Sequence, residues 1–132
     1  MENKRKHLEF IQNVIDRQAK NSFLLKGWGI TIIAALFAFT SKDGALKPIL
    51  TVYALILVFW VLDSYYLWQE RLYRALYGHV RKLKDEDIDF DMNAKRFSKE
   101  TNCSWWDTVS SRTLFLFYFS LMIFTVVFFC WR

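Results

Sequence analysis

The chain has 132 residues, of which 54% are hydrophobic, 19% aromatic and 23% charged, and its formal net charge is +5. This composition is too apolar for an ordinary soluble domain and too charged for a chain that lies wholly in lipid, so the two kinds of residue must be segregated along the sequence. A single proline, few glycines and no alternation of period two predict an all-α membrane protein.

Residues 1–21 are predicted to form an amphipathic helix on the cytoplasmic side. Leu8, Ile11 and then Val14 or Ile15 recur at helical spacing, while charged residues occupy the other faces. This helix could lie on the membrane surface or pack against the protruding part of a second helix. Because its polar face mixes charges of both signs, packing is the favoured alternative.

Residues 22–69 are predicted to form a hairpin of two membrane-spanning helices. The first span, Ser22 to Thr40, has about the length that a bilayer requires, and the short loop Ser41–Lys47 makes the two spans antiparallel neighbours. One face of the first span carries small residues at steps of three and four, namely Gly27, Thr31, Ala34, Ala38 and Ser41. That face either lets helices pack closely, which is the simpler explanation, or lines a narrow pore.

Lys26 and Asp63 are charged residues expected inside this hairpin. Counted outward from the loop centre near Gly44, they reach a similar depth on the two helices, where each charge alone would be costly. We therefore predict an intramembrane ion pair between them. Asp63 has two alternative roles, a bond to a neighbouring subunit or a position in a water-filled vestibule.

The second helix is predicted to continue beyond the membrane. Apolar residues from Pro48 to Leu62 give way to an aromatic girdle and then to charges, without a clear helix breaker. A helix from Pro48 to Lys84 would be roughly 55 Å long, against a hydrocarbon core of about 30 Å. Its protruding part begins a predicted cytoplasmic collar, residues 70–112.

The protruding part carries an apolar stripe and a basic stripe. The apolar stripe, Leu72, Leu76 and Val80, needs a partner, which is either the first helix or the same helix of another subunit. The basic stripe is simply a solvated face, or it becomes a site for an anionic ligand where copies meet around an axis. The candidate ligand-binding residues are Arg71, Arg74, Arg81, Lys82 and Lys84.

Five acids between Asp85 and Asp91 have a spacing like that of a calcium loop. Phe90 stands where an EF-hand loop beginning at Asp85 needs glycine, and Arg96 stands where the loop needs glutamate. We therefore predict a connecting loop and no metal site.

Residues 113–132 are predicted to form the third span, a phenylalanine-rich helix that faces lipid as an outer wall. Most basic residues lie in the N-terminal arm and in the long loop. The positive-inside rule then places the N-terminus and the collar in the cytoplasm.

The sequence shows no catalytic, cofactor-binding or metal-binding constellation. His7 and His79 stand alone, and the cysteines lack metal-ligand spacing, so neither an enzyme nor a cofactor is expected. One protomer with three spans is too small to enclose a pore. Function is therefore expected to require a homo-oligomer, such as a tetramer, around an axis.

Two segments resemble a family of small bacterial membrane proteins. The first runs from Asn21 to Trp28, before the small-residue face, and the second runs from Phe59 to Tyr77 and contains Asp63. Over about residues 8–90 the chain resembles the SLATT-type pore-forming effectors of antiphage defence, and among them the membrane effector of the Hailong system.

This resemblance implies a multi-pass ion channel of the bacterial inner membrane, whose opening depolarises and kills an infected cell. It also implies that the channel is held closed at its cytoplasmic collar by an oligonucleotide that a partner nucleotidyltransferase makes. The acidic loop departs from this picture, because its charges cancel those of the basic residues beside it. The alternative function is a non-conducting membrane anchor or scaffold that recruits a cytoplasmic partner through its collar.

Overall fold

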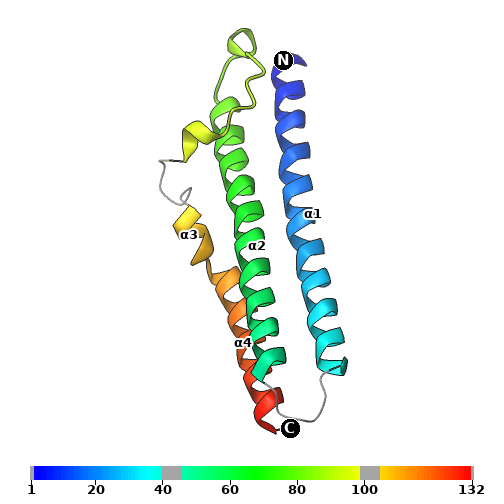
Figure 1. Cartoon of the computed structure of the whole chain (residues 1–132). Helices are drawn as coiled ribbons and strands as arrows, with labels where there is room; N and C mark the ends of the chain where they lie inside the picture. The colour runs from blue at the N-terminus through cyan, green and yellow to red at the C-terminus, as the bar shows by residue number, and fades with distance from the viewer. Residues whose placement is uncertain (1, 40–45, 99–104, 132) are drawn as a thin grey trace.

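The computed structural model describes residues 2–39, 46–98 and 105–131 (Figure 1). Every regular element in this part of the chain is helical, which confirms the predicted all-α class. The elements are α1 (Glu2–Phe39), α2 (Leu46–Val80), the short helices η1 (Asp85–Asp87) and η2 (Lys95–Phe97), α3 (Trp105–Val109) and α4 (Arg112–Trp131).

The helices α1 and α2 form a long antiparallel hairpin, and the shorter α4 runs antiparallel to α2 along only one half of it (Figure 1). With 38, 35 and 20 residues, α1, α2 and α4 are about 57, 52 and 30 Å long. The length of α4 equals the hydrocarbon thickness of an ordinary bilayer, whereas α1 and α2 exceed it by about 20 Å or more.

Three helices in the described part of the chain are long and apolar enough to span a membrane. They are α1, the Pro48–Val80 part of α2, and α4. Large apolar side chains on these helices point away from the protein, and Phe23, Trp28 and Leu116 are 75%, 66% and 59% exposed. Such exposed apolar residues are expected of a membrane protein, since lipid can cover them.

The helix α2 begins at Leu46, within the predicted loop, and α4 begins at Arg112, one residue early; the two larger differences from the predicted boundaries lie elsewhere. The predicted N-terminal helix and first span are one uninterrupted helix, because α1 continues through Ser22. The helix α2 ends at Val80, not at Lys84. There the backbone N–H groups of Lys82 and Leu83 bond to carbonyls three residues back, which tightens the last turn, and Lys84 is extended.

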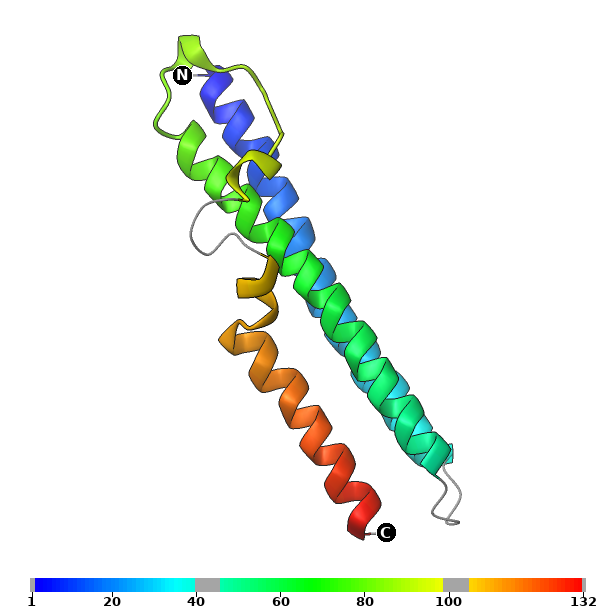
Figure 2. The same ribbon diagram turned by 60° about the vertical axis from the view of Figure 1, so that its left-hand side comes forward.

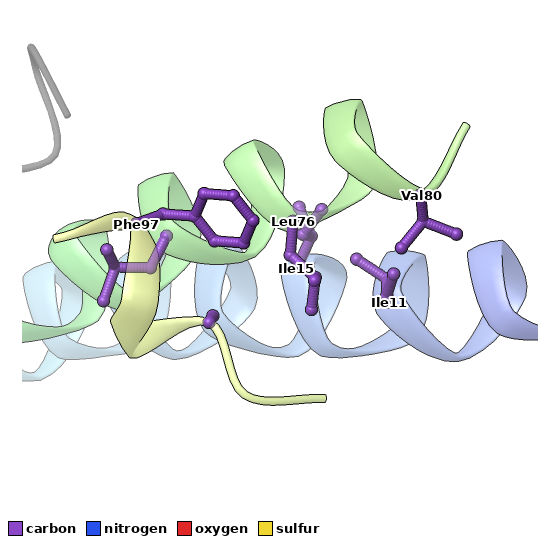
Figure 3. Close-up of a cluster of buried hydrophobic side chains, with 7 residues drawn as sticks. Ile11, Ile15, Leu76, Val80 and Phe97 are labelled. Carbon is purple, nitrogen blue, oxygen red and sulfur yellow. The ribbon is translucent and has the colours of Figure 1, made fainter. Parts of the chain in front are cut away.

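The end of the hairpin distal to α4 has an apolar core, and we call this end the headpiece. Ile11 and Ile15 of α1 pack against Leu72, Leu76 and Val80 of α2, and Ala94 and Phe97 cover this seam (Figure 3). The apolar face of α1 is thus covered by α2 of the same chain. Of the alternatives left by the sequence, the structure therefore shows packing against the second helix.

Residues 81–98 form a strap that crosses the free ends of α1 and α2 (Figure 2). Asp85 accepts a hydrogen bond of 2.9 Å from the backbone N–H of Lys4, in the first turns of α1. The first N–H groups of a helix lack intrahelical partners and carry partial positive charge, so a carboxylate there is favourable. One of the loop acids thus caps α1, a role that the sequence did not reveal.

The other half of the hairpin has its own buried cluster with α4. It contains Ile33 of α1, Val52 and Ile56 of α2, and Leu114 and Tyr118 of α4. This half holds the candidate site.

Candidate functional site

The structure brings Lys26 and Asp63 together at the centre of the three long helices. The Lys26 Nζ lies 2.5 Å from the Asp63 Oδ2, and the Asp63 side chain is completely buried. The Ser22 hydroxyl donates to the Asp63 Oδ1, and the Tyr118 hydroxyl donates to Oδ2 at 2.9 Å. One carboxylate thereby joins α1, α2 and α4.

The ammonium group of Lys26 has three partners. Besides Asp63 it donates to the Ser22 Oγ at 3.0 Å, and it lies over the Phe117 ring at 5.7 Å from the ring centroid. The Lys26 side chain is 21% exposed, whereas Asp63 is fully enclosed. The acid is therefore enclosed by its own chain, whereas part of the lysine side chain reaches the protein surface.

Tyr118 is held in place by aromatic packing. Its ring stacks on Trp60 with centroids 5.7 Å apart, and the Trp60 indole N–H donates to the Val109 carbonyl at 3.2 Å. The Tyr118 hydroxyl is also 3.2 Å from the Phe59 carbonyl oxygen. The segment before α4 thus positions the ring whose hydroxyl reaches the ion pair.

The role of Tyr118 was not predicted, because the sequence favours a third span that faces lipid as an outer wall. Most large side chains of α4 are exposed, as expected of an outer wall, but one face carries the buried residues Leu114, Tyr118 and Thr125, of which Leu114 and Tyr118 belong to the cluster shared with α1 and α2. One feature of the sequence could have identified Tyr118, namely that α4 contains a single tyrosine beside six phenylalanines. A hydroxyl on a membrane helix usually has a hydrogen-bond partner.

The group that we call the polar network consists of Ser22, Lys26, Asp63 and Tyr118. It lies within the membrane-spanning length of α4. Tyr118 follows Arg112, the first residue of α4, by six positions, or about 9 Å along the helix. The network is therefore about one third of the way into a span of about 30 Å. A buried charge at this depth is costly unless it is paired and hydrogen-bonded, and Asp63 meets both conditions.

The small-residue face of α1 points away from the rest of the chain. Gly27, Thr31, Ala34 and Ala38 are all exposed, and a Cβ added at Gly27 would meet nothing within 4 Å. Ser41 lies outside the described residues. The helix instead packs on α2 through neighbouring positions, where a Cβ added at Gly29 would lie 3.5 Å from the Phe59 ring. The small-residue face is therefore not the packing surface inside this chain.

The structure places the predicted anion-binding residues in different surroundings. Arg74 is engaged by Glu70 on the same helix, with its Nη2 2.7 Å from Oε1. Arg81 and Lys82 lie instead with His79 and Phe97 on a shallow groove of about 360 Å³. Arg71 and Lys84 do not line this groove. Arg71 is half-buried on α2, and Lys84 is exposed at the start of the strap.

Two of the strap acids, Asp89 and Asp91, accept hydrogen bonds from backbone N–H groups within the strap. Asp89 Oδ1 accepts from the Asp91 backbone N–H at 3.0 Å, and Asp91 Oδ1 accepts from the Asn93 N–H at 2.9 Å. The hydrogen bond from the Asp91 N–H lowers the pKa of Asp89 below its ordinary value. Within the described ranges, no group of three His, Cys, Asp or Glu residues is placed to hold a metal ion.

Comparison of the chain with protein-family models, with curated proteins and with solved structures gives no match. The geometry of the ion pair, the small-residue face and the basic groove is therefore the basis for a functional proposal.

Proposed function

We propose that the protein is a homo-oligomeric ion channel of the bacterial inner membrane, gated by an anionic nucleotide or oligonucleotide at a cytoplasmic headpiece. The observation that carries this proposal is the uncovered small-residue face of α1. In lipid, helices associate through small residues that let their backbones approach closely. A face of this kind that the chain itself leaves free is available to other copies.

The fold of one chain supports the need for several copies. Its three long helices share one buried cluster and one polar network, and Asp63 already accepts bonds from Ser22, Lys26 and Tyr118 of its own chain. A conducting path would therefore run between protomers. Thr31 and the small residues beside it would then either line that path or form the contacts around it.

The orientation follows from the distribution of basic residues. The headpiece carries Lys4, Arg5 and Lys6 at one end of α1 and Arg81 and Lys82 at the end of α2. The positive-inside rule favours the cytoplasm for such a segment. The α1–α2 loop and the C-terminus would then lie on the other side of the membrane.

The groove beside Arg81 and Lys82 is the better candidate for the gating ligand. Both side chains are exposed, whereas Arg74 already has Glu70 as a partner. A ligand bound through phosphates would lose affinity as salt rises, and it would bias the channel only through different affinities for the open and closed states. A role in antiphage defence is proposed from the resemblance of residues 8–90 described above.

The test combines particle size with ion flux for two neighbouring alanines. Ala34 belongs to the small-residue face, and the adjacent Ala35 is equally exposed but lies off that face. We expect the wild-type chain to form one oligomer in detergent and to pass ions in liposomes. The variant Ala34→Leu should lose both properties, whereas Ala35→Leu should keep them. A wild-type chain that is monomeric and passes no ions would overturn the proposal.

A scaffold that recruits a partner is the second candidate, because the headpiece has a second groove. This groove has a volume of about 610 Å³, lies between Leu8 of α1 and Tyr77 of α2, and is bordered by Lys4 and Arg5. The groove is also lined by Glu9, Gln12 and Asn13. An apolar floor with such a mixed polar border suits an amphipathic segment. Liposome flux separates the two functions, since a scaffold passes no ions at any protein density.

A further inference from the structure

The helix α4 carries a groove on its outer surface that none of the proposed functions uses. It has a volume of about 720 Å³ and begins at Arg112 and Thr113. Its walls are mainly apolar and continue to Phe124 through Leu116, Phe117, Ser120 and Leu121. Leu116 and Phe124 are more than half exposed, so the groove opens toward the surroundings of the helix.

The length of the groove matches one leaflet of a bilayer. Phe124 follows Arg112 by twelve residues, which is about 18 Å along a helix. One leaflet of a hydrocarbon core of about 30 Å is roughly 15 Å thick. The groove therefore extends from the boundary of the membrane to about its middle, which is the region that one acyl chain occupies.

The head of the groove is positive. Arg112 is exposed and forms no ion pair with any acid in the described ranges, and it stands at the N-terminus of α4, where the helix dipole also favours an anion. The nearby Lys26 adds little net charge, because Asp63 neutralises it. Exposed Trp106 in the preceding helix α3 is typical of the membrane boundary.

We propose that this groove binds one anionic phospholipid, with its phosphate at Arg112 and an acyl chain along Phe117, Leu121 and Phe124. The proposal depends on membrane insertion of α4 and not on ion conduction or on the number of copies. A small soluble anion would not fill an apolar groove of this length. A lipid satisfies both the positive head and the apolar walls.

The experiment measures lipid binding to the full chain in detergent by native mass spectrometry. The probes are dioleoyl phosphatidylglycerol and dioleoyl phosphatidylcholine, which share acyl chains and differ in headgroup charge. We expect the anionic lipid to bind about fivefold more tightly, the effect of one cation near an anionic surface. In Arg112→Gln this preference should fall to within about twofold.

Lys20 provides the matched control for charge. Lys20 is exposed and precedes Lys26 by six residues on α1, and Arg112 precedes Tyr118 by six residues on α4. Because Lys26 and Tyr118 both contact Asp63, Lys20 and Arg112 lie at a similar depth. Lys20→Gln should retain the preference for the anionic lipid. Equal losses in the two variants would show general surface attraction and would overturn the site.

A second variant tests the acyl part of the groove. Ser120 lines the groove, and its hydroxyl bonds only to the Leu116 carbonyl of the same helix, so Ser120→Phe should fill the groove without breaking a contact between helices. This variant should lower the affinity for both lipids, whereas Ile123→Phe, which is exposed outside the groove, should not. If Ser120→Phe binds both lipids like the wild type, or if Arg112→Gln leaves the lipid preference unchanged, the groove is not a lipid site.

Discussion

The two halves of the α1–α2 hairpin both have a buried apolar cluster, but among the described residues only the half beside α4 also buries an ion pair. In the headpiece the buried seam is apolar, with Ile11, Leu72 and Leu76, and charged side chains such as Arg74 are exposed. In the half beside α4 the carboxylate of Asp63 is as completely buried as the apolar Val52 and Ile56, while other apolar side chains cover the outside. The same two helices are thus held together by different interactions along their length.

This difference is the one expected if the headpiece lies in water and the half beside α4 lies in lipid. In water, burying apolar area is favourable by roughly 25 cal/mol per Å², so an apolar seam is enough to pair two helices. Lipid offers no such gain, since its chains are as apolar as leucine, and helices there depend on close packing and hydrogen bonds. The pairs Gly29–Phe59 and Asp63–Tyr118 provide these two interactions.

The largest effect is expected from breaking the ion pair. Asp63→Ala leaves the Lys26 ammonium without its acid in a partly buried position, and it should destabilise the protein by about 4 kcal/mol. The double variant with Lys26→Ala should cost less than the sum of the two single variants. Thermal unfolding in detergent measures both, with Asp16→Ala as a control on the exposed face of α1. Single variants that unfold at the wild-type temperature would show that the pair does not hold the helices.

The second prediction contrasts two leucines of α2. Leu76 is fully buried in the headpiece, and Leu76→Ala should cost about 3 kcal/mol through lost burial and a cavity. Leu62, which is 42% exposed beside the polar network, should tolerate the same change with a loss below about 1 kcal/mol. Equal losses in the two variants would remove the distinction between the halves. The same unfolding assay makes this comparison.

Tyr118→Phe should have a smaller effect, because it removes one hydroxyl and keeps the ring stacked on Trp60. A hydrogen bond between membrane helices contributes about 1 kcal/mol. Tyr65→Phe, on an exposed ring of α2, serves as the control and should be neutral. A stability loss in Tyr65→Phe as large as that in Tyr118→Phe would argue against a role for the network.

The smallest effect concerns the strap at low pH. The bond from the Asp91 N–H lowers the pKa of Asp89 below its ordinary value, so the carboxylate stabilises the strap above that ordinary pKa, and this contribution is lost as pH falls through the lowered pKa. An NMR titration of the Asp91 amide should follow this step, and Asp89→Asn should abolish it. An Asp91 amide that titrates alike in both proteins would show that another group is responsible.

The sequence could predict the hairpin because one short loop sets its register. Ser41–Lys47 allows only antiparallel neighbours, and equal counting from it places Lys26 opposite Asp63, as the structure does. Tyr118 could not be predicted in the same way. A long connection separates α4 from α2, so neither its register nor its rotation follows from local spacing.

The sequence also could not show which face of a helix is turned toward its neighbour. Periodicity shows that Gly27 and Thr31 share a face, but both that face and the one with Gly29 suit close packing, and only the structure shows which of them meets α2. The bond from the Lys4 N–H to Asp85 joins residues 81 positions apart. Contacts of this kind depend on the complete fold.

The most direct test locates the boundary between water and lipid along α2. Single cysteines replace Arg74, whose side chain is 64% exposed in the headpiece, and Val61, which is 52% exposed beside the network, after Cys103 and Cys130 are changed to serine. Inside-out membrane vesicles are then treated with a membrane-impermeant maleimide. We predict rapid labelling of Arg74→Cys and labelling of Val61→Cys only after detergent is added. Protection of Arg74→Cys in both inside-out and right-side-out vesicles, or free labelling of Val61→Cys, would contradict the division of the hairpin into a water-facing and a lipid-facing half.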